Sequence, residues 1–302
     1  MGFRTVIVRS RVKLELRLNY LVVRGEIEQK IYLDEIATLI VESTAVALTA
    51  ALLAELARRK INVVFCDDKH NPCAELTPFY GAHNTPKRYK EQIAWTRQAK
   101  DYVWGELIRA KIAGQAAVLE ELGFAAEGAL LRRYRAEVQA GDPANREGHA
   151  AKVYFNRWLG ERSRRQGGFV NACLNYGYAV LLSAFNREVV ASGYLTQLGM
   201  RHDNDCNAFN LSCDLVEPFR VVVDRRVMTL KAEQGDFRSR LADVINLKAE
   251  WEGRQTTLDV AIRGYVRNVT EVLREGGGAI GIPIVAHDKI GELSLYEIDG
   301  TV

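Results

Sequence analysis

"VKLELRLNY" (residues 12–20) alternates apolar and polar side chains along its whole length. A period of two indicates a β-strand with one buried face, because successive side chains of a strand point to opposite sides of the sheet. Similar short runs continue to about residue 80. Only the segment 45–59 has the pattern of a helix there, with Ser43 or Thr44 as its N-cap. The first part of the chain is therefore predicted to be a small β-sandwich with one helix.

The period changes to that of helices near residue 87. Apolar residues recur at helical spacing in 92–123, and comparable segments follow to about residue 275. "GAHNTPKR" (81–88) has the Gly and Pro punctuation of a link, and "EGGGAIGIPI" (275–284) ends the helical pattern. We therefore expect an α+β protein. The predicted domains are a β-rich, dimer-forming domain over 1–84 and an all-α catalytic domain over 85–302, with a short tail from about residue 276.

Composition favours a globular protein of the cytoplasm. The chain has 302 residues, of which 48% are hydrophobic and 26% charged. Its most apolar piece (45–57) is too short to span a bilayer, and residues 1–11 lack the order of a signal peptide. We expect no association with membranes.

Five cysteines are expected to be reduced thiols. Cys66 and Cys73 flank His70, which suggests a zinc site, but no second ligand pair follows at short spacing, so we regard this site as a minor alternative. Cys206 and Cys213 have no metal-binding spacing and are expected to be small buried hydrophobic side chains.

The net charge of +3 is weak evidence for a nucleic-acid partner, so the clustering of charge matters more. Residues 146–165 hold six basic side chains against two acidic ones. The basic residues are Arg146, Lys152, Arg157, Arg162, Arg164 and Arg165. Such a cluster is typical of a surface that contacts phosphates, although a solvated helix face has the same composition.

Acidic side chains occur in two segments of the predicted helical part, at Glu147 and within residues 201–220. Pro143 and Asn145 mark a helix start, and Glu147 lies on the apolar stripe of that helix, where a carboxylate needs a partner. The alternative is that Glu147 lies in the first turn, where the helix dipole favours an acid. In "RHDNDCNAFNLSCDLVEPFR" (201–220), Asp214 and Glu217 share a face if the segment is helical. A plain polar loop followed by a helix is the alternative there.

One imidazole with carboxylates from separate helices suits Mg²⁺ or Mn²⁺, and the imidazole favours Mn²⁺. Such ions usually serve phosphoryl transfer.

Three motifs of the chain resemble, in the same order, those of the CRISPR-associated spacer-acquisition integrases. They are "REGHAAKVYF" (146–155), "NACLNYGYAVLLS" (171–183) and "HDNDCNAFNLSCDLVEPFR" (202–220). These integrases are the first-numbered family of Cas proteins, and the chain looks most like the type II form.

The resemblance implies roles for particular residues. Glu147, His202 and Glu217 match the catalytic metal-site positions, and Asp214 matches a supporting acid; family members commonly have Asp at the position of Glu217. His149 is expected to point away from the site. The candidate DNA contacts are Arg146, Arg162, Arg164, Arg165, Asn175, Tyr176, Arg201 and Arg220. Asn171 and Tyr178 lie with Asn175 and Tyr176 in the central helix of the second motif, and packing in the core is an equal alternative for the two tyrosines.

The resemblance also implies a reaction and partners. A 3′-hydroxyl of a captured DNA fragment attacks a phosphodiester of the CRISPR repeat, and hydrolysis is the same chemistry with water attacking. Family members are homodimers that join the small second Cas protein, and in type II systems the effector nuclease also takes part. Two other functions are compatible with the residues: a DNA-binding scaffold without chemistry, and a metallohydrolase of small phosphate esters.

Overall fold

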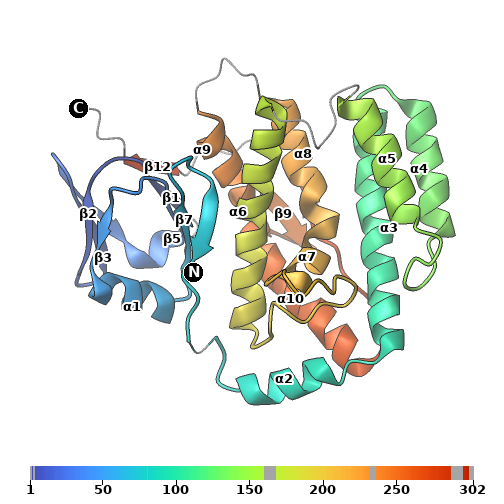
Figure 1. Ribbon diagram of the computed structural model, residues 1–302, viewed down its shortest axis with the longest axis horizontal. Helices are drawn as coiled ribbons and strands as arrows, with labels where there is room; N and C mark the ends of the chain where they lie inside the picture. The colour runs from blue at the N-terminus through green and yellow to red at the C-terminus, as the bar shows by residue number, and fades with distance from the viewer. Residues whose placement is uncertain are drawn as a thin grey trace.

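The computed structural model describes residues 2, 4–79, 81–159, 168–230, 236–286 and 295–298. Its β-rich half lies beside a helical half, as Figure 1 shows. The strands of the first half are β1 (Arg4–Val8), β2 (Lys13–Arg17), β3 (Tyr20–Arg24), β4 (Glu28–Tyr32), β5 (Ile36–Val41), β6 (Ala47–Leu48), β7 (Asn62–Cys66) and β8 (Pro72–Glu75). Its helices are η1 (Leu33–Glu35), a single 3₁₀ turn, and α1 (Ala50–Arg58).

These strands form two sheets. The first has the order β12-β1-β5-β7-β8, in which β12 (Leu295–Ile298) comes from the far end of the chain. Its strands pair in parallel except β7 with β8. The second sheet has the order β4-β3-β2-β6. Side chains such as Leu14, Leu39 and Leu52 bury a common core, which confirms the predicted small sandwich.

The alternating run at 12–20 is interrupted before its end. Leu18 and Asn19 form a two-residue turn, because Arg17 pairs with Tyr20 across β2 and β3. Leu18 has a φ of 54° and is 90% exposed. The pattern therefore predicted the strand correctly but not the hairpin, since an apolar residue occupies the turn.

Helix α1, the predicted helix of this half, is shorter than the segment 45–59. Ala47 and Leu48 pair with β2 as β6, so the backbone is still extended there. Thr49, rather than Ser43 or Thr44, is the N-cap, and its hydroxyl accepts a hydrogen bond of 3.3 Å from the backbone N–H of Leu52.

The helical half follows the link from residue 85 onward. Its helices are α2 (Thr85–Ile93), α3 (Arg97–Glu121), α4 (Ala125–Glu137), α5 (Arg146–Leu159), α6 (Phe169–Ala191), α7 (Asn210–Val216), η2 (Glu217–Phe219), α8 (Arg220–Met228), α9 (Phe237–Ala242), η3 (Asp243–Asn246) and α10 (Leu258–Glu275). The helical pattern ends at Glu275, where the tail was predicted to begin. No helix among the described residues is long and apolar enough to cross a membrane.

The expectation of an all-α second half needs one correction. Strands β9 (Lys248–Trp251), β10 (Arg254–Thr257) and β11 (Ile284–Val285) form a small antiparallel sheet. The β9–β10 hairpin turns at Glu252 and Gly253, which both have positive φ, the geometry of a type I′ turn. The strands are too short for the alternation of side chains to stand out from the helices around them.

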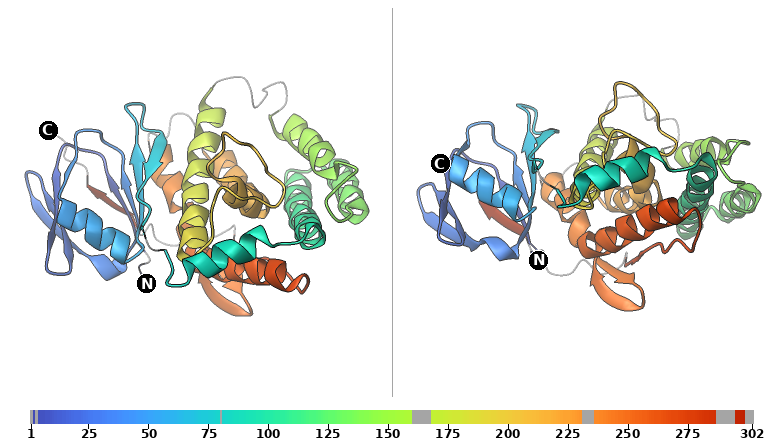
Figure 2. Two further views of the ribbon diagram at one scale, coloured as in Figure 1. Left: turned by 60° about the horizontal axis from the view of Figure 1, so that its bottom comes forward. Right: turned by 90° about the horizontal axis from the view of Figure 1, so that it is seen from below.

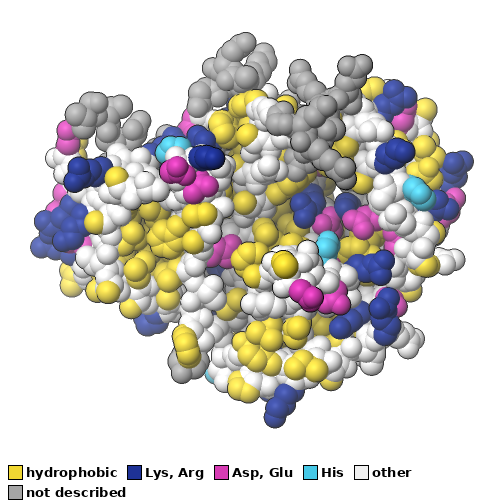
Figure 3. All heavy atoms as spheres, in the orientation of Figure 1, with side chains coloured by type: hydrophobic (Ala, Val, Ile, Leu, Met, Phe, Trp, Pro, Cys, Tyr) yellow, Lys and Arg dark blue, Asp and Glu magenta, His cyan; other side chains and the backbone are white. Residues whose placement is uncertain are grey.

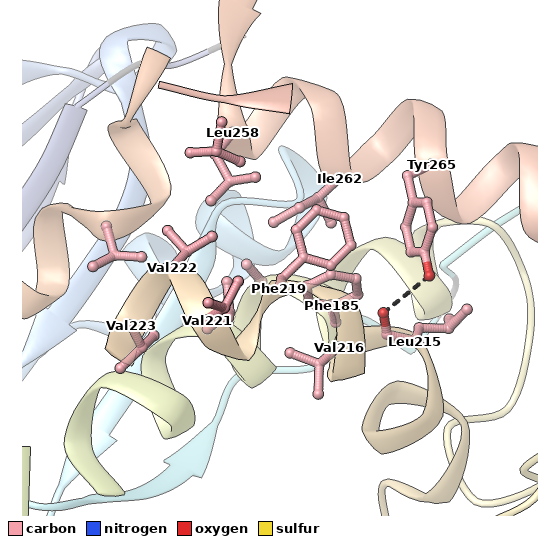
Figure 4. Packing of buried hydrophobic residues seen from close by; sticks show 14 of the residues in the cluster. Phe185, Leu215, Val216, Phe219, Val221, Val222, Val223, Leu258, Ile262 and Tyr265 are labelled. Carbon is pink, nitrogen blue, oxygen red and sulfur yellow. Dashed lines mark hydrogen bonds between the residues drawn. The ribbon is translucent and has the colours of Figure 1, made fainter. Parts of the chain in front are cut away.

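Helix α6 lies in the middle of the molecule in Figures 1 and 2, with the β-rich half on one side and α3, α4 and α5 on the other. Its Phe185 packs against Phe219, whose ring also meets Tyr265 at a centroid distance of 4.9 Å (Figure 4). The Tyr265 hydroxyl donates a hydrogen bond of 3.1 Å to the carbonyl oxygen of Leu215. This packing fixes the short segment that joins α7 to α8.

Candidate active site

The first acidic residue of the site is placed by a helix cap. Asp142 accepts hydrogen bonds of 2.9 Å from the backbone N–H groups of Arg146 and Glu147, so its side chain caps α5. Glu147 therefore lies in the first turn of the helix, as one interpretation of the sequence held. Its side chain is 26% exposed and contacts Lys111, so the partner that the other interpretation required is also present.

Glu217 occupies η2, next to the aromatic packing around Phe219. Its side chain is only 5% exposed, and its Oε1 accepts a hydrogen bond of 2.9 Å from Nε of Arg220. Burial raises the pKa of the Glu217 carboxyl, but the charges of Lys111 and Arg220 outweigh burial and hold that pKa below its usual range. Glu217 is thus a buried carboxylate that stays ionised.

Lys111 joins these two acids and was not among the predicted site residues. It extends from α3, and its Nζ lies 2.6 Å from Oε1 of Glu147 and 2.6 Å from Oε2 of Glu217. The sequence did contain a signal, since Lys111 lies on the same apolar stripe as Ile108 and Ile112. A lysine on a buried stripe needs anionic partners, just as an acid there needs cationic ones.

His202 is oriented by Asp214. The fully buried Asp214 carboxylate accepts backbone N–H groups of Met200, Arg201 and His202, and its Oδ1 lies 2.6 Å from Nδ1 of the imidazole. This hydrogen bond raises the pKa of His202 against the effect of partial burial. The ring packs edge-on against Trp104. Because Nδ1 is engaged, Nε2 is the nitrogen left to bind a ligand.

The donor atoms of Glu147, His202 and Glu217 are of the types that bind a divalent cation. One imidazole nitrogen and two carboxylates form a donor set suited to Mg²⁺ or Mn²⁺. Oε2 of Glu217 is buried and lies 2.6 Å from the Lys111 ammonium, so a cation already occupies the position beside it. In the part of the chain that the structure describes, no three His, Cys, Asp or Glu side chains are close enough to hold an ion as they stand, and Lys111 lies between two of them.

The site lies at the surface between separate groups of helices. Figure 3 shows acidic and basic side chains gathered with a histidine on the face between α8 and the α3–α5 helices. The exposed fraction of the His202 side chain, 40%, indicates that the imidazole is accessible from solvent. A large polymeric substrate could therefore reach it without passing through a closed pocket.

The candidate DNA contacts lie in different surroundings. Arg201 and Asn175 are exposed. Arg146 pairs with Glu137 and lies over the Tyr134 ring of α4. His149 contacts the same ring, whereas Glu147 contacts Lys111 of α3, so these two side chains of α5 face different helices. Arg220 pairs with Glu217 and lies over the ring of Tyr178. Arg162, Arg164 and Arg165 lie outside the described residues.

Tyr176 requires a correction. It is 1% exposed and belongs to the main hydrophobic core, where it meets the ring of Phe237. The packing alternative is therefore the right one for this residue, because an inward-facing position on α6 leaves no surface for DNA. Tyr178 faces Arg220 instead, and its hydroxyl donates to Asp224, which also accepts a hydrogen bond of 3.0 Å from Tyr154.

Cys66, Cys73 and His70, considered as a zinc site from the sequence, lie at the β7–β8 hairpin. Cys66 is buried and Cys73 is exposed, and they belong with His70 to no three-ligand group among the described residues. Cys206 is exposed and Cys213 is half-buried. The expectation that both would be buried was wrong. Cys206 lies in the 201–209 segment, which runs as a surface loop held by Asn side chains, and Cys213 lies on a partly covered face of α7.

Comparisons with known proteins identify the family of the chain. The family model "CRISPR associated protein Cas1" matches residues 5–252. The "CRISPR-associated endonuclease Cas1" of Neisseria meningitidis serogroup C is 35% identical over 243 residues, which are 80% of each chain. A protein of Pyrobaculum aerophilum named "CRISPR-associated endonuclease Cas1 1" is 27% identical over 77% of this chain and 83% of its own.

Solved structures share the fold. "Casposase bound to integration product" superposes with a TM-score of 0.75 at 17% identity and covers 97% of this chain and 96% of its own. A CAS1 protein from Thermotoga maritima gives a TM-score of 0.72 at 16% identity over 92% and 99%. In the "Cas6-RT-Cas1--Cas2 complex" the TM-score is 0.71 at 18% identity, and this chain spans 36% of the length of the chain it matches. From the matched family model and the meningococcal relative, the chain belongs to the Cas1 family of CRISPR-associated proteins.

Proposed function

We propose that this protein is a divalent-metal-dependent DNA endonuclease and integrase that inserts short foreign DNA fragments into a CRISPR array. One observation carries the proposal: Glu147 and Glu217, from separate elements, meet at a single cation position. His202 completes the donor set, held by a buried carboxylate. The relatives named endonucleases and the fold shared with a casposase bound to an integration product support the same chemistry. The type II form fits the similarity to the Neisseria meningitidis relative.

Glu147, Glu217 and Nε2 of His202 would hold Mg²⁺ or Mn²⁺. When bound, such an ion neutralises the non-bridging phosphate oxygens and makes the attacking oxygen a better nucleophile. Asp214 keeps the imidazole in one tautomer and orientation through its hydrogen bond to Nδ1. Arg220, paired with Glu217 and partly exposed, keeps that carboxylate ionised and places a positive charge beside the substrate phosphates.

In the proposed reaction, the 3′-oxygen of the incoming fragment forms a new bond to a repeat phosphorus. The bond from that phosphorus to the original 3′-oxygen breaks. The attacking hydroxyl loses its proton to the site or to solvent, and the departing 3′-oxygen takes up a proton and leaves as a new 3′-hydroxyl. One phosphodiester replaces another, so no external energy source is needed. Water in place of the 3′-hydroxyl gives hydrolysis, which accounts for an endonuclease activity by the same residues.

A scaffold that only binds DNA is the alternative function. Acids beside phosphates weaken DNA binding, so a scaffold gains nothing from Glu147 and Glu217. Glu147→Gln removes one charge and one ligand at constant shape. If the site is catalytic, strand transfer should collapse while the affinity for DNA holds or rises. Strand transfer at the wild-type rate, or activity that persists in excess EDTA, would contradict the metal mechanism.

The basic segment gives the reciprocal test. Replacing Arg162, Arg164 and Arg165 with Ala should weaken DNA binding broadly across sequences. It should also reduce the slope of log affinity against log salt by about 0.9 for each phosphate that the variant no longer neutralises. Fluorescence anisotropy over a salt series measures both effects. If this variant binds DNA as tightly as wild type and the wild-type protein cleaves small phosphate esters, the alternative of a metallohydrolase of small phosphate esters is favoured.

The proposed partners are DNA, as captured fragments and as the CRISPR repeat, a second copy of this chain, and the small second Cas protein. Structures titled as complexes of Cas1 and Cas2 contain the same fold, which supports the second Cas protein. The homodimer and a contribution from the type II effector nuclease rest on the family resemblance. Light scattering at micromolar concentration tests the dimer. Copurification followed by insertion into a repeat-containing plasmid tests the complex.

A further inference from the structure

Lys111 occupies the position between the two acids where a cation would bind. Its Nζ lies 2.6 Å from an oxygen of Glu147 and 2.6 Å from an oxygen of Glu217. Those two oxygens are therefore no more than twice that distance apart. The lysine side chain is 12% exposed, so little water screens the three charges from one another. The pair is held together by the ammonium group, because two carboxylates this close repel each other without a cation.

A divalent ion and this ammonium group cannot share the pair. Mg²⁺ binds carboxylate oxygens at about 2.0–2.1 Å, so an ion between the two acids would stand in the space that Nζ now fills. Charge leads to the same conclusion. The charges of Lys111 and Arg220 already balance those of Glu147 and Glu217, so a divalent ion added to these four groups would bring an excess of two positive charges to a mostly buried place. Withdrawal of the lysine halves that excess.

The two cations beside Glu217 differ in how easily they can leave. Arg220 is fixed by its hydrogen bond to Oε1 of Glu217 and by the Tyr178 ring beneath its guanidinium group. Lys111 is a point charge on a flexible stem, with no planar fork that locks it to both acids. The two cations also use different oxygens of Glu217: Arg220 binds Oε1, and Lys111 contacts Oε2 at 2.6 Å, so the lysine can leave without disturbing the arginine. This contact is the exchangeable one.

We propose that Lys111 is a built-in competitor for the metal site. It holds Glu147 and Glu217 in the metal-free protein and withdraws when a divalent ion binds, so it weakens the affinity for the ion and sets the concentration at which the site fills. This inference rests on the proposed metal site and adds to it a residue that regulates occupancy. It explains why the acids lie together although the described residues contain no three-ligand group.

The test is Mn²⁺ binding to the full chain, measured from the electron paramagnetic resonance signal of free Mn²⁺ at neutral pH. Lys111→Met should tighten binding by about ten-fold or more, because the ion no longer displaces an ammonium group. Lys100→Met is the matched control, since Lys100 lies on the same helix and pairs with neither acid. Mn²⁺ should also raise the melting temperature of Lys111→Met by more than that of wild type. Equal or weaker Mn²⁺ affinity in Lys111→Met would overturn the proposal.

Two further variants keep the outcomes distinct. If Lys111→Met does not fold, Lys111→Arg decides. A guanidinium fork can bridge both acids, so Mn²⁺ should bind this variant about three-fold more weakly than wild type, and equal or tighter Mn²⁺ binding overturns the inference.

Glu147→Gln separates this inference from the proposed function. If Mn²⁺ binds wild type and Lys111→Met equally and Glu147→Gln abolishes binding, only the role of Lys111 fails. If Mn²⁺ binds neither protein, the metal site fails as well.

Discussion

Two groups of charged side chains in the helical half each contain two cations and two anions, but they differ in how accessible they are to solvent. Arg187 and Arg263 pair with Glu188 and Asp259, joining α6 to α10. Arg187 also donates a hydrogen bond to the carbonyl oxygen of Ala37 in β5, so the group reaches into the β-rich half. Both of its carboxylates are 5% exposed.

The second group, Lys111 and Arg220 with Glu147 and Glu217, also has two cations and two anions. Here one carboxylate is 26% exposed, an accessible imidazole lies nearby, and the bridging cation is a lysine rather than an arginine. The closed group can only hold elements together, whereas the open group can exchange its cation and meet a substrate. Charge balance alone therefore does not distinguish a structural ion network from a functional one; accessibility and the geometry of the cation do.

The largest effect should come from the open group. His202→Ala removes one donor of the proposed metal site, and a metal contribution of several kcal/mol corresponds to a loss of about a thousand-fold in strand transfer. The fold should stay intact, because the imidazole is accessible and the buried Asp214 carboxylate, although it loses its contact with the imidazole, keeps the three backbone N–H groups that donate to it. His149→Ala, at an exposed position of α5, is the matched control and should keep activity. Loss of activity in both variants would mean that the assay reports folding.

The closed group should show the opposite result. Arg187→Met leaves Glu188 and Asp259 buried without their main cation and should lower the free energy of unfolding by about 3–5 kcal/mol in urea titrations. Activity per folded molecule should stay near that of wild type. Arg58→Met, at an exposed pair with Glu55, should cost about 1 kcal/mol or less. Equal costs for the two variants would show that burial of the Arg187 group has no special weight.

An intermediate effect is expected from the residue that orients the imidazole. Asp214→Asn keeps the shape but leaves one oxygen to accept hydrogen bonds, so strand transfer should fall by about 10–100-fold. The measurement is the rate per folded molecule, since the missing acceptor also costs stability. Asp203→Asn, on the exposed part of the same loop, is the control. Strand transfer at the wild-type rate in Asp214→Asn would contradict the orienting role of Asp214.

The smallest effect concerns pH. The hydrogen bond to Asp214 raises the pKa of His202 above its ordinary value of 6.5. The protonated imidazole therefore stabilises the folded state fully below the unfolded pKa, and this contribution is lost as pH rises through the folded pKa. The stability difference between wild type and His202→Gln should narrow over that range. For Arg58→Met, at the exposed pair with Glu55, the stability difference from wild type should stay flat over the same range; a narrowing for both variants would mean that the imidazole is not its cause.

Much of the fold could be predicted from the sequence because its signals are local. Alternation at 12–20 marked a strand, and Pro143 with Asn145 marked the start of α5. The spacing of acids and histidine in 201–220 pointed to a site, and Asp214 proved to hold His202. Where the local signal was interrupted, as by the apolar turn residue Leu18, the prediction was wrong only in its bounds.

The tertiary structure decided which charges meet. Periodicity shows that a helix has a buried face, but it does not show which residue of a distant helix lies opposite. Lys111, Glu147 and Glu217 come from three elements, and only their packing brings them to one point. The same holds for β12, which pairs with β1 across nearly the whole chain. Because the cost of burying a charge depends on partners far away in sequence, a site made of such charges is defined by the fold and not by any single motif.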